Sequence, residues 1–276
     1  MIDPHEIERL EASARRIRAN ILRQIHVAGS GHPGGSMSCV EILTALFVHR
    51  IQPPAGWFGR NARDRVILSK GHAAPALYAA FAEVGMIPDA ELDTLRQLGS
   101  RLQGHPDRTR LPEVEMSTGS LGQGLSVSLG IALALELRNE PYYSYAILGD
   151  GEINSGQIWE AVAYAGAHKV DRLVAILDAN GIQNDGRIEE VLELRPYAPK
   201  FEAFGWAVRE CDGQTMAEVV AAVDWASSDA PGKKPRLVIA HTTKGAGVSF
   251  MSDRADWHSH TINDAQLTAA LEEVMG

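Results

Sequence analysis

Residues 145–152 read YAILGDGE and residues 173–183 read LVAILDANGIQ, and these two stretches decide the fold. Each begins with a short apolar run that leads directly into glycines and polar residues. With a helical stretch between them, the runs are typical of a strand–helix–strand unit of a parallel sheet. Ligands bind beyond the carboxyl ends of such strands. Asp150 and Asn180 follow adjacent strands there, and with phosphate oxygens they suit a hard divalent cation, Mg²⁺ or Ca²⁺.

Each of these two residues also has a simpler structural interpretation. Asp150 alone is typical of a cap for the helix that follows, and Asn180 alone is typical of a turn before Gly181. Because both occur together at strand ends one strand–helix–strand unit apart, the sequence favours their interpretation as metal ligands through side-chain oxygens.

Strands and helices alternate along the rest of the chain. Ser38 with Glu41 predicts the capped start of a helix that runs to Val48. The pattern predicts an α/β fold, a doubly wound and mostly parallel sheet with helices on both faces, as one domain over residues 1–276. We expect strands over 65–68, 144–148, 172–178, 206–209 and 236–240, and helices over 5–28, 73–84, 122–137, 155–167, 198–204, 215–227 and 264–275.

A long segment in the middle of the chain differs from this pattern. Residues 99–124 are rich in Gly, Pro, Ser and Thr and predict an extended functional loop. The helix expected next, from Gly122 to Leu137, consists of small apolar residues that allow close packing. We expect it to be central and buried, either within this chain or in the core of a homodimer.

Composition excludes several classes of partner. The net charge is −9 and no basic cluster interrupts it, which argues against nucleic acid and anionic membranes. The acidic, helical N-terminus is unlike a signal peptide, and no apolar run approaches the ~20 residues that span a bilayer. Cys39 and Cys211 have no metal-ligand spacing, which favours reduced, buried thiols. We expect a cytoplasmic protein.

Further glycine motifs carry candidate functional residues. Three of the ten histidines, His32, His72 and His105, directly follow glycine. A single loop histidine is usually a surface residue, but the repeated context favours function, and the ordinary pKa of histidine near neutrality suits proton transfer. Residues 117–124 read STGSLGQG, and residues 241–247 read HTTKGAG and lead to DWH at 256–258.

Together with GDG at 149–151 and the spaced Asn180, these motifs resemble the thiamine-diphosphate motif. From Gly31 to His258, the chain is similar to the N-terminal half of transketolase. The resemblance implies thiamine diphosphate and Mg²⁺ or Ca²⁺ as cofactors, with the backbone carbonyl of Ile182 as a third metal ligand. It implies cofactor contacts from Gly119, Leu121, Gly149, Asp150, Gly151, Asn180, Gln183 and Lys244, and substrate binding and proton transfer by His32, His72, His105 and His258.

The chain departs from the family pattern at three positions. His241 stands where Lys is common, and Ser259 follows His258 where Gly is usual. Ser155 stands where many transketolases carry a Glu that joins paired active sites, and Glu152 and Glu160 are nearby but out of register. Lys244 has an ordinary surface lysine as its alternative interpretation.

The resemblance also implies a partner. The family's pyrimidine-binding domain carries the Glu that activates the cofactor, and no strand–helix series for it follows in this chain. We expect a C-terminal pyrimidine-domain subunit on a separate chain, a homodimer core and an α₂β₂ complex acting on sugars or sugar phosphates.

Two other functional interpretations remain open. One is a subunit of another thiamine-diphosphate enzyme, a 2-oxo acid dehydrogenase first component or a deoxyxylulose-phosphate synthase type. The other is a cofactor-binding subunit without turnover of its own. The Gly-His set and the loop 117–124 favour transketolase, and NAD binding is disfavoured because no G-x-G-x-x-G follows a strand.

Overall fold

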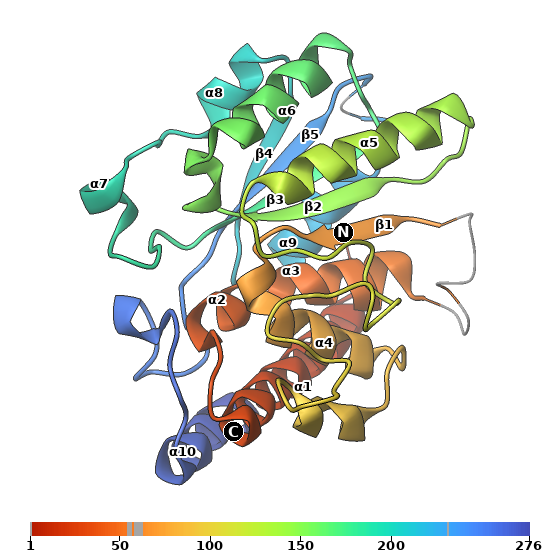
Figure 1. The fold of residues 1–276 in the computed structure, drawn as a ribbon. Helices are drawn as coiled ribbons and strands as arrows, with labels where there is room; N and C mark the ends of the chain where they lie inside the picture. Colours follow the sequence, from red (N-terminus) through yellow and green to blue (C-terminus); the bar gives the residue numbers. More distant parts are fainter. Residues whose placement is uncertain (1, 54–56, 58–62, 231) are drawn as a thin grey trace.

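A parallel sheet forms the centre of the molecule (Figure 1). The computed structural model describes residues 2–53, 57, 63–230 and 232–276. The sheet has the order β1-β2-β3-β5-β4, and all of its neighbouring strands pair in parallel. The predicted α/β fold is therefore confirmed. The strands are β1 (Arg65–Leu68), β2 (Ser144–Gly149), β3 (Leu173–Ala179), β4 (Ala207–Asp212) and β5 (Arg236–His241).

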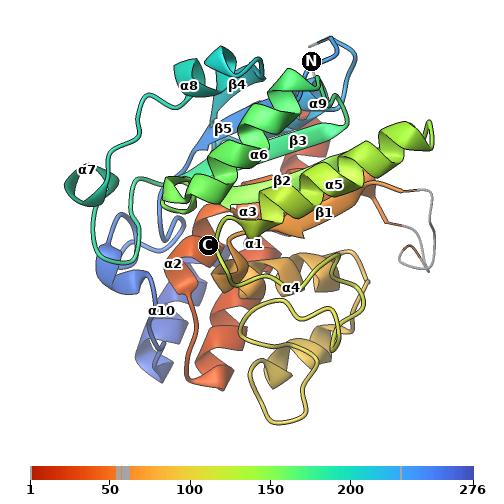
Figure 2. The ribbon, with the colours of Figure 1, turned by 45° about the horizontal axis from the view of Figure 1, so that its top comes forward.

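Helices cover both faces of this sheet, as Figures 1 and 2 show. On one face lie α1, α3, α4 and α9, with α10 packed against α1, and on the other lie α5, α6 and α8. The α-helices are α1 (Pro4–Ala28), α2 (Pro33–Ser38), α3 (Val40–Thr44), α4 (Ala74–Glu83), α5 (Gln123–Leu137), α6 (Gly156–Ala167), α7 (Ile188–Val191), α8 (Ala198–Ala203), α9 (Met216–Ala226) and α10 (Asp264–Met275). Short turns of other helix types cover Ala45–Ile51, Gly71–Ala73, Asp89–Thr94, Glu152–Asn154 and Ala255–Trp257.

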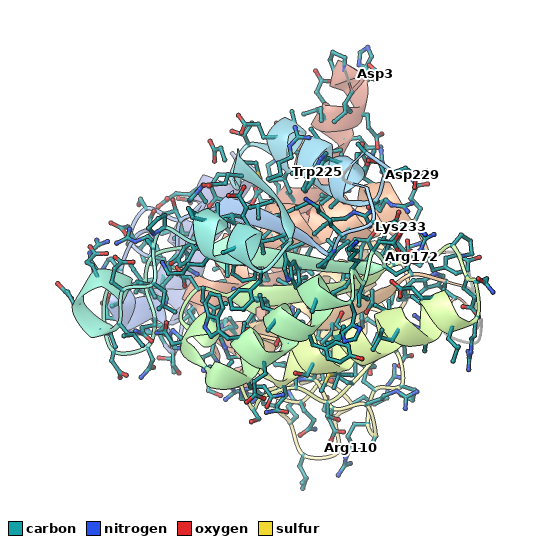
Figure 3. The ribbon with its side chains drawn as sticks, turned by 90° about the horizontal axis from the view of Figure 1, so that it is seen from above. Asp3, Arg110, Arg172, Trp225, Asp229 and Lys233 are labelled. Carbon is teal, nitrogen blue, oxygen red and sulfur yellow. The ribbon has the colours of Figure 1, made fainter. Side chains whose placement is uncertain are left out.

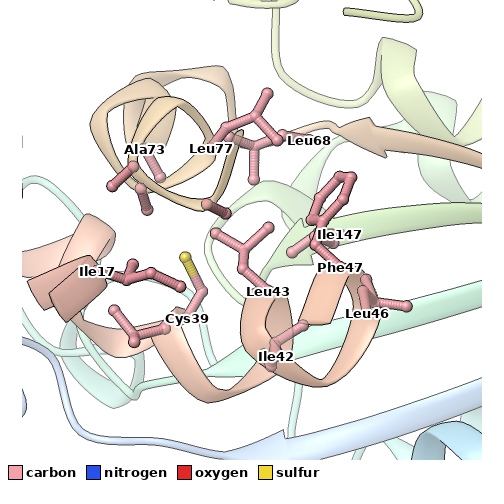
Figure 4. Packing of buried hydrophobic residues seen from close by; sticks show 14 of the residues in the cluster. Ile17, Cys39, Ile42, Leu43, Leu46, Phe47, Leu68, Ala73, Leu77 and Ile147 are labelled. Carbon is pink, nitrogen blue, oxygen red and sulfur yellow. The ribbon is translucent and has the colours of Figure 1, made fainter. Parts of the chain in front are cut away.

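Two hydrophobic cores separate the sheet from its helices. Successive residues of a strand point to opposite faces, so Tyr145 and Ile147 of β2 belong to one core and Ala146 and Leu148 to the other. The larger core includes the packing around Cys39 in Figure 4. Burial on both faces explains why the central strands β2 and β3 are nearly continuous apolar runs.

The edges of the sheet differ in character. Arg172, Asp229 and Lys233 lie at the amino-terminal edge (Figure 3), where Arg172 and Lys233 line one surface hollow. The glycine-rich turns lie at the opposite, carboxyl edge. No helix in the described part of the chain is long and apolar enough to cross a membrane.

The predicted helix start at Ser38 is wrong. Ser38 ends α2, and its hydroxyl donates to Asp178 at 2.7 Å instead of capping a helix. Glu41 accepts a hydrogen bond from Arg18 at 2.8 Å. Both side chains are buried, so each pairs with a buried charged group from another part of the fold, Ser38 with Asp178 and Glu41 with Arg18.

The helix α5 is less buried than predicted. One side packs on the sheet through Leu125, Leu129 and Ala132. On the other side Val127 is 38% exposed, and Leu137 at the helix end is 86% exposed. The expectation of a helix buried within this chain is therefore wrong, because the sheet covers only one side of it.

The contact between α6 and the turn that links α8 to β4 allows a test of packing. A Cβ atom at Gly166 would lie 1.7 Å from the carbonyl oxygen of Phe204, whereas a Cβ atom at Gly156 would meet nothing within 4 Å. We expect Gly166→Ala to destabilise the chain by about 1–3 kcal/mol or more, since backbone must move. Gly156→Ala is the matched control on the same helix. Urea unfolding checks this, and equal stability of the two variants would contradict it.

Candidate active site

A cavity of about 130 Å³ opens at the carboxyl edge of the sheet. Residues that follow four strands line it: Lys70 after β1, Asp150 after β2, Asn180 after β3 and Lys244 after β5. Parallel strands deliver their carboxyl ends to one edge, so segments far apart in the sequence meet here. The lining is completed by Gly35, His72, Leu121, Gly149, Gly151, Glu152, Ile182, Gln183, Asn184 and His258.

Asp150 joins the ends of β2 and β3. One carboxylate oxygen accepts the Gly181 N–H at 2.6 Å, and the other accepts the Gly151 N–H at 2.9 Å. Burial, followed by the nearby charge of Asp178, raises the pKa of Asp150 to about 6. A cation at this carboxylate would relieve both effects.

Asn180 and Ile182 present oxygen atoms at the same edge. The Asn180 side-chain nitrogen donates to Asp178 at 3.1 Å, and its oxygen accepts the Ile182 N–H at 3.1 Å. The Ile182 carbonyl accepts from the Lys244 ammonium at 3.0 Å. Within the described residues no group of three or more His, Cys, Asp and Glu side chains could hold a metal. A metal here would have to combine carboxylate, amide and carbonyl oxygens.

Sequence reasoning missed the buried ion pair of Lys70 and Asp178 beneath the cavity. The Lys70 ammonium also donates to the Gly35 carbonyl at 2.8 Å. Burial alone would lower the pKa of Lys70, but the Asp178 carboxylate and the other acidic groups nearby together outweigh it and raise that pKa. The sequence carried a signal, because Asp178 directly follows the apolar run 173–177 and Lys70 comes two residues after the apolar run 66–68.

Four histidine rings meet beside the cavity. His32 lies 5.4 Å from His72, 6.1 Å from His105 and 5.5 Å from His258, measured between ring centroids, and His72 and His258 are 5.1 Å apart. Burial, with help from Arg96, lowers the pKa of His32 to about 4. Burial and the Lys244 charge lower that of His258 to about 3, and burial also lowers the pKa values of His72 and His105. The rings are therefore neutral near pH 7.

Lys244 fixes the proton on one of these rings. Its ammonium lies 2.8 Å from His258 Nδ1. Because an ammonium can only donate, we assign Nδ1 as the acceptor and place the ring proton on Nε2. Burial lowers the pKa of Lys244 to about 8. The surface interpretation of Lys244 is wrong, since the side chain is 1% exposed.

The glycine-rich loop lies over the end of β1. A Cβ atom at Gly71 would lie 2.6 Å from Thr118 Oγ1 and 2.9 Å from the Gly119 nitrogen. Only glycine permits this approach. The loop brings Leu121, which is 43% exposed, to the cavity and places Gly119 beside His105.

Several polar atoms at the site are buried without a hydrogen-bond partner among the described residues. They are Gln183 Nε2, His32 Nδ1 and Thr118 Oγ1. Buried polar groups are normally paired, so these atoms indicate a polar ligand. Gln183 also packs closely against the GDG turn at 149–151, since a Cβ atom at Gly151 would lie 2.8 Å from Gln183 Cβ.

The structure thus brings nearly all the sequence-predicted residues together. His105 lies slightly apart, in an adjoining opening that Arg96 and Asp107 also line. His241 lies outside the site, where its Nε2 is 2.6 Å from Glu210 at the surface.

The chain matches a known family of domains. Residues 10–276 match the family model of the transketolase, thiamine diphosphate binding domain. A 6-deoxy-6-sulfo-D-fructose transketolase subunit of Clostridium sp. (strain MSTE9) is 42% identical over 96% of both chains. An apulose-4-phosphate transketolase subunit of Phocaeicola vulgatus is 39% identical over 98% of this chain and 95% of its own length.

Solved structures agree with these relatives. The transketolase from Leishmania mexicana superimposes with a TM-score of 0.89 at 28% identity. The match covers 96% of the present chain and 41% of that transketolase, so the chain spans about four tenths of its length.

The lowered pKa of His32 predicts a pH dependence of stability. Between pH 6.5, the ordinary pKa of histidine, and about pH 4, the His32 ring is protonated in the unfolded chain but not in the folded chain. Stability therefore falls as the pH drops through this interval. We expect His32→Gln to lose less free energy of unfolding than the parent chain between about pH 7 and pH 5. Urea titrations at both pH values measure this, and equal losses would count against it.

Proposed function

This chain is a thiamine diphosphate binding domain of the transketolase family, and we propose that it forms the diphosphate-binding subunit of an enzyme. That enzyme would transfer a two-carbon ketol unit between sugars or sugar phosphates. One observation carries the proposal: the cavity that Asp150 and Asn180 line is also lined by His72 and His258, which belong to the cluster of four neutral histidines. The first set suits a metal diphosphate, and the second suits hydroxyl groups.

The residues present fit the cofactor. The side-chain nitrogen of Gln183, which lines the cavity, has no hydrogen-bond partner among the described residues, and the buried Asp150 carboxylate accepts from the Gly151 and Gly181 backbone N–H groups. We propose that Asp150, Asn180 and the Ile182 carbonyl hold Mg²⁺ or Ca²⁺, with Gly149, Gly151 and Lys244 around the diphosphate. The Ile182 carbonyl already accepts a hydrogen bond from the Lys244 ammonium. A metal bound to this carbonyl must therefore either share the oxygen with Lys244 or replace that hydrogen bond.

The chemistry that thiamine diphosphate supplies when bound is a carbon nucleophile that also accepts electrons from the bond being broken. The side chains of this chain bind and orient the sugar. Neutral imidazoles both donate and accept hydrogen bonds, so His32, His72 and His105 can bind hydroxyls and exchange protons with them. His258 offers its Nε2 proton, because Lys244 occupies Nδ1.

We infer a heteromeric assembly from the relatives and from α5. Relatives that the chain covers almost completely are named as subunits. We propose residues 1–276 as a single cofactor domain that works with a separate C-terminal pyrimidine-domain subunit. Val127 on the uncovered side of α5 supports a homodimer through this helix, within an α₂β₂ complex.

A reconstitution experiment tests the function. We expect the chain alone to show negligible ketol transfer and to gain it on addition of a pyrimidine-domain subunit, thiamine diphosphate and Mg²⁺. Coupled turnover assays with ketose donors, and light scattering for the α₂β₂ mass, measure both claims. Robust turnover by the single chain, or no larger species with the partner present, would reject them.

Asp150→Ala tests the metal assignment. Loss of residues that merely support metal ligands costs about 10–100-fold in affinity, so loss of a ligand is expected to cost at least as much. We expect calorimetry on the assembled complex to find cofactor binding at least about 100-fold weaker and no longer dependent on Mg²⁺. Unchanged affinity and metal dependence would remove Asp150 from the site.

His105→Ala and His32→Ala test the histidine roles. A positioned acid or base contributes ~10²–10⁴-fold in rate. We therefore expect kcat/KM to fall within this range while the cofactor Kd changes less than about threefold, since both rings face the substrate side. Steady-state kinetics and calorimetry separate the two effects, and unaltered kcat and KM would exclude these residues.

A further inference from the structure

Glu152 is a buried carboxylate that the proposed mechanism does not use. It follows the GDG turn in sequence, is 2% exposed and lies at the wall of the cavity. In the sequence it is out of register with the family Glu. Because Glu152 is buried within one chain, its side chain cannot contact a second copy of the chain. Its role must therefore differ from that of the family Glu, which joins paired active sites.

Its two oxygens join three segments. Glu152 Oε1 accepts the Gly122 N–H at 2.9 Å and the hydroxyl of Ser69. Glu152 Oε2 accepts the Gly149 N–H at 3.1 Å. One carboxylate therefore ties the end of β1, the end of β2 and the loop 117–122 to one another.

The same segments are closely packed around these hydrogen bonds. A Cβ atom at Gly124 would lie 2.5 Å from Ser69 Cβ. Gly122 has a φ of +89°, a conformation that favours glycine. The loop itself has no helix or strand through residues 117–122. Its position over the cavity therefore depends on contacts with other segments, and Glu152 supplies one of them, a hydrogen bond from the Gly122 N–H to a carboxylate oxygen.

We propose that Glu152 is a positioning residue that fixes the loop 117–122 against the strand ends, so that Gly119 and Leu121 are held where thiamine diphosphate binds. The inference rests on the proposed function and deepens it. The GDG turn would hold one end of the cofactor and the loop would contact the other, and Glu152 would set the distance between these two elements.

The geometry requires a carboxylate and not merely a side chain of this size. Gly122 and Gly149 donate to different oxygens, so both oxygens must be acceptors. In Glu152→Gln, whichever way the amide turns, its NH₂ group meets one of these two N–H groups. The substitution keeps the volume and removes one tie.

The test compares Glu152→Gln with Asp64→Asn. Asp64 is also a buried carboxylate and accepts the Tyr143 N–H at 2.8 Å, but it lies at the opposite ends of β1 and β2. Asp64→Asn therefore controls for loss of stability. Hydrogen exchange over residues 117–125 of the full chain reports loop order without cofactor. Calorimetry with thiamine diphosphate and Mg²⁺ on the assembled complex reports affinity.

We expect Glu152→Gln to speed exchange in 117–125 by about tenfold or more, and to weaken cofactor binding by about 10–100-fold. Asp64→Asn should leave both within about threefold of the parent. Parent-like exchange and affinity in Glu152→Gln, or an equal loss in Asp64→Asn, would overturn the inference. If the parent complex itself fails to bind thiamine diphosphate, the proposed function falls, and the exchange data still decide whether Glu152 orders the loop.

Discussion

The buried carboxylate of Asp178 is the constraint on which the site depends. It accepts from Lys70 after β1, from Ser38 in α2, from Asn180 after β3 and from Thr242 after β5. A charge in this position is costly unless every oxygen is paired, so the partners cannot be moved independently. By taking the nitrogen of the Asn180 amide, Asp178 also turns the amide oxygen away from itself. The orientation of a proposed metal ligand is therefore set by the layer beneath it.

Above this layer, burial gives the cavity two chemical characters. Desolvation raises the pKa of Asp150, so a bound cation would stabilise its carboxylate. Desolvation also lowers the pKa values of His32 and His258, so these rings remain neutral. A metal diphosphate and an uncharged polyol suit these two environments. The same cause thus supports both halves of the proposed reaction, and it acts because helices cover both faces of the sheet.

Much of the fold was predictable, for identifiable reasons. The strands β2 and β3 are buried on both faces, and a glycine stands at the end of β2 or two residues after the end of β3, so their apolar runs are readily identified as strands. The helix start at Ser38 was mispredicted because Asp178, far away in sequence, takes its hydroxyl. The burial of α5 was mispredicted because small apolar residues permit close packing on a sheet and on another chain equally well. Local pattern cannot distinguish these two environments.

By itself, the sequence determined the parallel α/β architecture and the positions of the polar residues that follow its strands, because apolar periodicity and glycine turns are local properties. It also indicated Asp150, Asn180 and the Gly-His residues as functional candidates. Only the tertiary structure decided that four histidines meet, that Lys70 pairs with Asp178, and that Glu152 joins the loop 117–122 to the strand ends. These contacts depend on crossovers that bring distant segments to one edge, where burial decides which charges must pair.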